Sequence, residues 1–363
     1  MFPRLEYLEW ISGRPEVALY DLGSSDLRGD RGHGPEVVPA PLGGLDDPPT
    51  GATLETMIAG EYGVEPEQVL VTAGATMANL LAVATTLQRR TDEDEKRRVL
   101  VEKPGYEPLV ETPSAFDAAV DRFLRGDHYG LGPERIEKAM TDSTRLVTVT
   151  NRHNPTGALT DRETLSDVAD VVSDGGARLL VDEVYAPYTT EALDGPFGGP
   201  SAVGLDDTVV TNSLTKFYGL DDLRIGWLVA DEEFVADARS LSHHFLTVAD
   251  TSRALGKRAF HNSDYLAERS RTLVQENADL LRDFIESRDD VEGFLAEGST
   301  YAFLDPENAD GDELTQAAWE EGVLVVPGRF FDNDDRVRVS LGRSPTEVAP
   351  ALAALGEVLD GFA

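Results

Sequence analysis

A lysine and an arginine stand eight residues apart between two apolar segments of the chain. Lys216 follows the apolar run 208–211, and Arg224 comes just before the run 225–230. A lysine in a turn between two buried strands is held near the core, where burial disfavours its ammonium form and leaves an amine that can attack a carbonyl. The guanidinium of Arg224 can hold a phosphate by two parallel hydrogen bonds. The pair suggests pyridoxal phosphate, an aldehyde with a phosphate tail; the alternative is an ordinary surface lysine and arginine.

Two turns earlier in the chain carry residues that suit such a ligand. Residues 72–76 lie between a predicted strand and a predicted helix, so the free N–H groups beside Ala75 and Thr76 could approach an anion. Tyr106 follows a Pro-Gly pair after the next strand and could lay its ring against a flat heteroaromatic ligand. Each turn alone is also consistent with ordinary structure, a common strand-to-helix turn and a tyrosine that closes the core.

Two later segments add an amide, a carboxylate and a phenol. Asn154 lies in a turn that the following Pro and Gly fix, so its donor and acceptor are aimed together. Asp182 ends an apolar strand, where an unpaired carboxylate would be costly. A protonated pyridine nitrogen would satisfy it and keep the cofactor an electron sink, while a protein arginine is the alternative partner. Tyr185 could hydrogen-bond the phenolic oxygen of the cofactor.

Composition limits the classes of protein to consider. The chain has 363 residues, 41% of them hydrophobic, which is enough for two globular domains. No apolar run approaches the roughly 18 residues of a membrane span, and the charged first residues lack the apolar centre of a signal peptide. Without cysteine there is no disulfide framework and no thiolate metal site, and we expect no metal. We expect a cytoplasmic enzyme.

The net charge is unusual. Lys and Arg number 32 against 67 Asp and Glu, which gives a formal net charge of −35. Only five of the 32 basic residues are lysines. Self-repulsion of this size destabilises a compact state unless salt screens it, so we expect a protein adapted to a salt-rich cytoplasm. An acidic surface for basic partners is the alternative, which the even spread of acids disfavours. Binding to nucleic acid is disfavoured by the charge.

Apolar periodicity predicts alternating strands and helices from about residue 68. The predicted strands are 69–72, 99–101, 120–124, 146–150, 179–181 and runs near 209 and 228, and the helices are 52–62, 76–89 and 161–173. Such a pattern indicates a mostly parallel sheet covered on both faces, with ligands bound beyond the carboxyl ends of its strands. A helical region at 233–288, strands at 301–304, 323–326 and 337–341, and helices at 312–320 and 345–360 indicate a smaller α+β domain.

Together and in order, these segments resemble the fold-type I pyridoxal-phosphate enzymes, specifically the class I/II aminotransferases. The most specific motifs are Asn154-Pro-Thr-Gly, Asp182-x-x-Tyr185, and Ser213-x-Thr-Lys216 with Arg224 eight residues later. The resemblance covers nearly the whole chain. It implies a mostly parallel seven-stranded sheet sandwiched by helices, with a smaller α+β domain. We divide the chain into an N-terminal arm that forms part of the small domain (1–45), a large cofactor-binding domain (46–232) and a C-terminal small domain (233–363).

The resemblance also implies roles. Lys216 forms a Schiff base with the cofactor and moves the proton at the substrate Cα, and Asp182 pairs with the pyridine nitrogen. Asn154 and Tyr185 hydrogen-bond the ring oxygen, and Tyr106 stacks on the ring. The residues implied for the phosphate are Ala75, Thr76, Ser213 and Arg224.

For the substrate, the resemblance points to the small domain. Arg338 matches the arginine that grips the α-carboxylate, with Arg336 as the alternative because it faces the same side of the strand. Gly23 resembles the position that closes over the substrate. Many members carry a tyrosine that reaches the phosphate of the partner subunit, but residues 46–49 here are Asp-Asp-Pro-Pro. No motif places a second arginine that would bind the side-chain carboxylate of a dicarboxylate substrate. Arg253 and Arg329 are the two candidates for that role.

We therefore expect a homodimeric pyridoxal-phosphate-dependent aminotransferase that moves an amino group between an L-amino acid and a 2-oxo acid. A lyase or decarboxylase with the same cofactor is the first alternative, because these motifs specify the cofactor better than the bond that is broken. A non-catalytic effector domain is the second. The effector-domain alternative lacks support because the sequence shows no basic N-terminal helix-turn-helix pattern for binding DNA.

Overall fold

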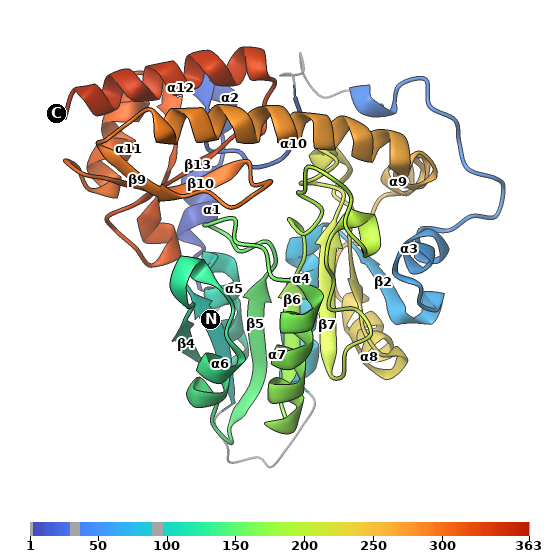
Figure 1. Ribbon diagram of the computed structural model, residues 1–363. Coiled ribbons are helices and arrows are strands. Elements are labelled where there is room, and N and C mark those ends of the chain that lie inside the picture. The colour runs from blue at the N-terminus through green and yellow to red at the C-terminus, as the bar shows by residue number, and fades with distance from the viewer. Residues whose placement is uncertain (1–2, 30–36, 89–96, 363) are drawn as a thin grey trace.

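Seven strands form the central sheet of the computed structural model, which describes residues 3–29, 37–88 and 97–362 (Figure 1). Their order across the sheet is β2-β8-β7-β6-β5-β3-β4. Every neighbouring pair is parallel except those of β8, which runs antiparallel to both β2 and β7. The expected mostly parallel, seven-stranded sheet is confirmed. The strands are β2 (Val69–Thr72), β3 (Arg98–Lys103), β4 (Ala119–Leu124), β5 (Thr144–Thr150), β6 (Arg178–Asp182), β7 (Thr208–Ser213) and β8 (Gly226–Val229).

Helices cover both faces of this sheet because its strands are apolar on both sides. In β3, Val99 and Val101 pack with α4 (Ala75–Gln88) and α8 (Glu232–Ser242). Leu100, between them, points to the opposite face and packs in the cluster that includes α7 (Arg162–Asp174). This period of two is the geometry of a β-strand, and it explains why the strands read as continuous apolar runs. The same cluster as α7 also contains residues of α3 (Leu54–Tyr62), α6 (Pro133–Ala139) and α9 (Asp250–His261).

A second sheet lies beyond the carboxyl ends of the central strands. It is antiparallel, with the order β12-β13-β10-β9, and two of the helices that pack against it follow β10 in the chain. Its strands are β9 (Val291–Phe294), β10 (Tyr301–Pro306), β12 (Val326–Pro327) and β13 (Val337–Ser340), and the helices are α11 (Gly311–Glu320) and α12 (Pro345–Asp360). This is the smaller α+β unit that the sequence predicts.

The N-terminal residues join that smaller unit. Strand β1 (Tyr20–Asp21), which the sequence does not predict, pairs in parallel with β11 (Val323–Leu324). Two short helices, α1 (Glu6–Ile11) and α2 (Arg14–Val17), precede it, and Tyr7 of α1 packs on Phe330 and Phe331. Another short helix, α5 (Glu107–Glu111), follows β3.

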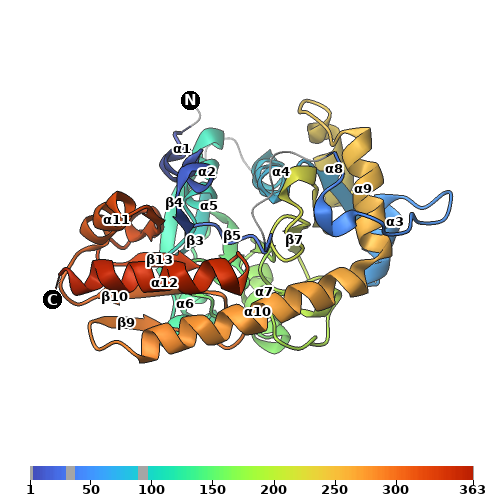
Figure 2. The same cartoon turned by 90° about the horizontal axis from the view of Figure 1, so that it is seen from above.

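One long helix connects the two units. Helix α10 (Ser263–Glu286) has 24 residues, about 36 Å, and runs along the molecule beside α12 (Figures 1 and 2). Its first half contributes Leu266 and Val274 to the core of the large sheet, and its second half contributes Leu281 to the core of the small one. The predicted division at residue 232 stays a prediction. Because α8, α9 and half of α10 pack on the large sheet, we propose a boundary within α10.

The helical region predicted at 233–288 contains three helices, separated at residues 243–249 and at Asn262. Strand β9 was not expected from the sequence, because its four residues include Glu292 and Gly293 and lack an apolar run. No helix in the described parts of the chain has the length and apolar character needed to cross a membrane.

Candidate active site

All the residues that the sequence predicts for the site line one cavity of about 370 Å³. It lies where the carboxyl ends of the central strands face the small sheet. Residues from four central strands or the turns after them meet β13 and the N-terminal segment there. The predicted residues in the cavity wall are Gly23, Ala75, Thr76, Tyr106, Asn154, Asp182, Tyr185, Ser213, Lys216, Arg224 and Arg338. The described residues contain no cluster of three or more His, Cys, Asp or Glu side chains that could hold a metal.

Lys216 lies in the turn after β7, and its Nζ donates a hydrogen bond to Ser25 Oγ at 3.2 Å. Burial by itself lowers the pKa of this lysine, but the acidic groups Tyr185 and Asp26 around it outweigh burial, and the pKa is raised. The expectation that burial leaves a neutral amine is therefore wrong here. The sequence shows that the lysine is near the core, but it does not reveal which acidic groups surround the amine.

Asp182 ends β6 and is 4% exposed. Its Oδ2 accepts a hydrogen bond from Asn79 Nδ2 at 2.7 Å, and its Oδ1 accepts one from the Val184 N–H at 3.2 Å. Thr211 orients the amide of Asn79 through a 2.6 Å hydrogen bond. Since these partners are neutral, burial raises the pKa of Asp182 to about 6. A cationic group in the cavity would relieve this cost.

Sequence reasoning missed Asn79. It is a buried amide on α4, a helix whose other buried residues are Ala, Leu, Val and Thr. A polar side chain on such an apolar helix needs a hydrogen-bond partner, and this was the available signal.

Another part of the cavity wall suits an anion. Gly74, with φ of 80°, stands just before α4, and an added Cβ there would lie 3.1 Å from Arg224 Nη2. Arg224 is held by Asp221 at 2.9 Å and keeps its side chain 56% exposed. The guanidinium and the N-terminal N–H groups of α4 thus lie side by side. Lys216 and Arg224 share this region because β7 and β8 are antiparallel neighbours, so one connection carries both.

Arg338 lies on β13 and is 1% exposed. Its Nη1 donates to Asn154 Oδ1 at 2.9 Å, and its Nη2 donates to Gly23 O at 3.1 Å and to the Tyr7 hydroxyl at 3.3 Å. Its buried Nε has no hydrogen-bond partner among the described residues. The three contacts fix the guanidinium in the cavity with a donor left over for a ligand.

The other arginines considered for the substrate lie outside the cavity wall. Arg336 pairs with Asp305 at 2.9 Å, and Arg253 pairs with Glu55 at 2.6 Å. Arg329 pairs with Asp312. Among the described residues, the cations of the cavity wall are Lys216, Arg224 and Arg338.

The segment that lacks the expected tyrosine is held by the end of α9 and the residue that follows it. Asp47 accepts a hydrogen bond from Arg258 Nε at 2.8 Å, and the carbonyl of Asp46 accepts one from Asn262 Nδ2 at 3.0 Å. These contacts give the segment a structural role in this chain.

Tyr185 and Tyr106 are the two aromatic residues predicted to contact the cofactor. The Tyr185 hydroxyl is 2.6 Å from Ser25 Oγ. Tyr106 precedes α5, and its ring meets that of Tyr7 edge-on, with the centroids 5.8 Å apart. Ser25 and Tyr7 were missed because the N-terminal segment carries no recognisable motif around them.

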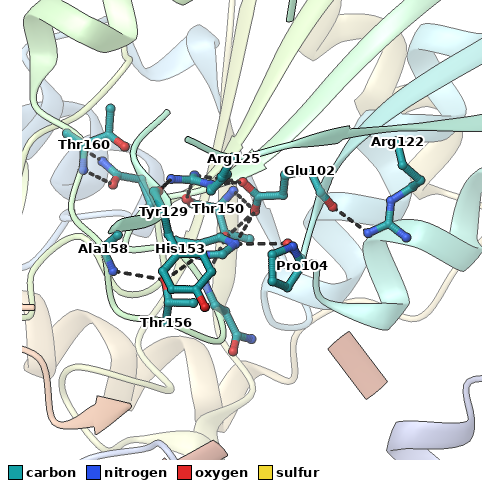
Figure 3. Close-up of polar contacts among 12 residues, drawn as sticks. Glu102, Pro104, Arg122, Arg125, Tyr129, Thr150, His153, Thr156, Ala158 and Thr160 are labelled. Atoms are coloured by element: carbon teal, nitrogen blue, oxygen red, sulfur yellow. Dashed lines mark hydrogen bonds and ion pairs between the residues drawn. The ribbon is translucent and has the colours of Figure 1, made fainter. Parts of the chain in front are cut away.

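A buried polar network supports the turn that carries Asn154 (Figure 3). Glu102 pairs with Arg125 at 2.8 Å, and both side chains are 1% exposed. Glu102 also accepts hydrogen bonds from the N–H and the hydroxyl of Thr150, at 2.8 and 2.6 Å. The Thr150 hydroxyl in turn accepts the N–H of Asn154 at 3.0 Å. Burial holds the pKa of His153 well below its usual value, so the ring is neutral and contacts Thr156 and the Pro104 carbonyl.

We predict that Arg125→Met lowers the free energy of unfolding by about 3 kcal/mol, because it leaves the charge of Glu102 buried and unpaired. Urea unfolding measures the loss. Arg4→Met is the control, since Arg4 and Glu9 form an exposed pair, and it should change stability by less than about 1 kcal/mol. Equal losses in the two variants would contradict the prediction.

The cavity fits pyridoxal phosphate at three points. A buried carboxylate with only neutral partners, Asp182, suits a protonated ring nitrogen. The glycine turn, the N-terminus of α4 and Arg224 suit the phosphate. The amine of Lys216 lines the same cavity and suits the aldehyde.

Comparisons with known proteins agree with this fit. Residues 46–355 match the family described as aminotransferase class I and II. The chain is 28% identical over 312 residues to histidinol-phosphate aminotransferase of Haloferax volcanii, covering 84% of this chain and 79% of that protein. It is 25% identical over 334 residues to aspartate aminotransferase of Bacillus subtilis, covering 84% and 79%.

A solved structure gives the same result. The crystal structure of a PLP-dependent aminotransferase from Streptococcus suis matches with a TM-score of 0.84 and 25% identity, over 100% of this chain and 99% of that one. The chain therefore belongs to the class I and II aminotransferases and is a pyridoxal-phosphate-dependent transaminase.

Proposed function

We propose that this cavity transfers an amino group between an L-amino acid and a 2-oxo acid, with Lys216 as the reacting amine. One observation carries the proposal. Lys216, Asp182 and Arg338 come from three separate strands or the turns after them, and all three line the same 370 Å³ cavity. An amine, a carboxylate and a fixed guanidinium are the groups that proton transfer, cofactor activation and carboxylate binding need.

Different residues of the chain perform these roles. Arg338 binds the α-carboxylate of the substrate, and Asn154 holds its guanidinium in place through the 2.9 Å hydrogen bond. Lys216 moves the proton at the substrate Cα. Tyr185 donates a hydrogen bond to the ring oxygen. The walls from α1, Leu8 and Ile11, help to exclude water.

Bound pyridoxal phosphate supplies an aldehyde that takes up the amino group and an electron-withdrawing ring that acidifies the Cα–H bond. Asp182 holds the proton at the ring nitrogen, and it can do so because its present partners are donors that do not neutralise it. Arg224, Ser213 and the turn before α4 hold the phosphate.

We predict that Asp182→Asn weakens the binding of pyridoxal phosphate roughly ten- to hundredfold, because a charge-assisted hydrogen bond is lost. Absorbance titration of cofactor-free protein gives the dissociation constant. Glu183→Gln is the matched control: this neighbour is buried too, but its carboxylate accepts from the Ala202 N–H at 2.7 Å and does not line the cavity. If both variants bind the cofactor as the wild type does, the role of Asp182 is wrong.

The direct test of the function is a visible spectrum of the purified protein in high salt, recorded with a panel of L-amino acids. Conversion of the cofactor to pyridoxamine phosphate, with stoichiometric 2-oxo acid, is the expected result, and it ranks the substrates. Release of ammonia, thiol or carbon dioxide without that conversion would count against the proposed reaction.

We also propose that the enzyme is salt-adapted, homodimeric and cytoplasmic. The net charge of −35 supports salt adaptation, as does the similarity to the Haloferax volcanii protein. Leu246 and Tyr265, 88% and 57% exposed, support a dimer because a second copy could cover them. A composition without cysteine suits the cytoplasm. Light scattering at molar and at low salt tests salt adaptation and dimerisation together. The expected result is a dimer that dissociates or unfolds at low salt. Fractionation of the producing cells tests the location.

A further inference from the structure

The segment that follows β1 enters the active-site cavity and is tied to the large unit by several hydrogen bonds. The side chain of Ser25 contacts the Tyr185 hydroxyl, with Oγ and OH 2.6 Å apart. The Ser25 carbonyl accepts a hydrogen bond from the Tyr188 hydroxyl at 2.6 Å. The Leu27 N–H donates to the Lys216 carbonyl at 3.0 Å. A residue from the N-terminal arm is therefore fixed beside the proposed reacting amine.

The Ser25 side chain bridges two groups of the site. It is 5% exposed, and its Oγ accepts from Lys216 Nζ at 3.2 Å while it contacts Tyr185. An ammonium can only donate, whereas a hydroxyl both donates and accepts. When the lysine is charged, Ser25 accepts from it and donates to the phenol oxygen. When the amine is neutral, the Ser25 hydroxyl can donate to it instead, so the hydrogen bond between Ser25 and Lys216 persists in either protonation state and the Tyr185 proton stays available for the ring oxygen.

The groups around Lys216 explain why its neutral amine needs a hydrogen-bond donor. A base for the substrate Cα must be a neutral amine. The carboxylates and phenols near the amine favour the ammonium instead, and two guanidiniums share the cavity. The acidic groups are Tyr185, Asp26, Tyr7, Asp221 and Asp182, and the guanidiniums are those of Arg224 and Arg338. A donor aimed at the nitrogen holds the neutral amine in place once a proton has left it.

We propose that Ser25 is a positioning residue whose hydroxyl holds the free amine of Lys216 in reach of the substrate through a hydrogen bond. This inference rests on the proposed function, in which Lys216 moves the proton at Cα. It makes the N-terminal arm part of the proton-transfer apparatus.

The first test uses cofactor-free protein and cyanate, which carbamylates neutral amines. Ser25→Ala removes the hydroxyl that donates to the lone pair of the neutral amine, so Lys216 should react about fivefold faster at fixed pH. Peptide mass mapping reads each lysine separately. Lys138, which is exposed on α6, serves as the internal reference and should react at the same rate in both proteins.

The second test uses the holoenzyme and an amino acid deuterated at Cα. Ser25→Ala should lower kcat about tenfold, leave KM unchanged and increase the kinetic isotope effect, because proton transfer becomes slower than the other steps. Ser25→Thr keeps the hydroxyl and should restore most of kcat. Tyr188→Phe is the matched control, because it removes another anchor of the segment without touching the Ser25 hydroxyl.

Two results would overturn the inference: an unchanged carbamylation rate at Lys216 in Ser25→Ala, or an increased isotope effect in Tyr188→Phe equal to that in Ser25→Ala. The second result would mean that the segment needs only to be anchored. If Ser25→Ala does not fold, Ser25→Cys replaces the hydroxyl at similar size and carries the same expectations. Retained Cα–H exchange in Lys216→Ala would instead reject the proposed function, which separates the two failures.

Discussion

Replacing Lys216 by alanine is expected to lower kcat for transamination by about 10⁴-fold, the upper range for removing a general acid–base group. The variant loses the amine that lines the cavity together with the buried carboxylate of Asp182 and the guanidinium of Arg224. Among the described residues, no other lysine lines the cavity, so no second amine can take its place. Single-turnover conversion of pyridoxal phosphate to pyridoxamine phosphate is the measurement, because it reports the chemical step without product release.

Lys138→Ala is the control for this variant, since it removes an exposed lysine that does not line the cavity. It should keep wild-type turnover. Methylamine added to Lys216→Ala should restore part of the rate if the lost group is an amine that moves a proton. Wild-type turnover in Lys216→Ala would reject the mechanism.

Arg338→Ala should reduce kcat/KM for amino acid substrates by roughly 10²- to 10³-fold, the cost of removing one partner of a buried, hydrogen-bonded charge pair. The guanidinium is 1% exposed and has a buried Nε without a partner, so a carboxylate would be desolvated and held by directed hydrogen bonds. Steady-state kinetics with one amino acid and one 2-oxo acid measures the change. Arg338→Lys keeps the charge but not the planar fork, and it should recover only part of the loss.

Arg336→Ala is the matched control, because it lies two residues away on the same strand and pairs with Asp305 outside the cavity. It should change kcat/KM by less than about threefold. A large loss in Arg336→Ala together with a small one in Arg338→Ala would reverse the assignment of the substrate arginine.

Much of the fold follows from the sequence because the central strands are apolar on both faces. Runs such as Leu146 to Thr150 and Leu179 to Val181 need helices on both sides, and their alternation with helices implies parallel pairing. Short elements were harder to predict. Strand β1 is two residues long and is stabilised by its pairing with β11, about 300 residues away, which local pattern does not reveal.

The residues of the site also fall into two groups, those whose place follows from the local sequence and those placed by contacts with distant residues. Lys216 and Asn154 stand in turns after apolar strands and Asp182 ends such a strand, so their place at one edge of the sheet follows from topology. Asn79 and Ser25 reach the site through contacts with residues more than 100 positions away. The raised pKa of Lys216 was missed for the same reason, since Asp26 is brought to it only by the fold.

The central sheet has a second edge, at the amino ends of its parallel strands, and the turns there carry no residue of the cavity. Residues 174–176 precede β6 and residues 204–207 precede β7; all are exposed except the half-buried residue 205. Gly176 and Gly204 have φ of 72° and 82°, and a Cβ added to either meets no atom within 4 Å. Exposed tips of this kind tolerate insertions and new chain ends. An affinity tag, a fused domain or the termini of a circular permutant placed at Gly176 or Gly204 should therefore leave catalysis intact, which gives this enzyme a side for immobilisation opposite to the side that takes up substrate.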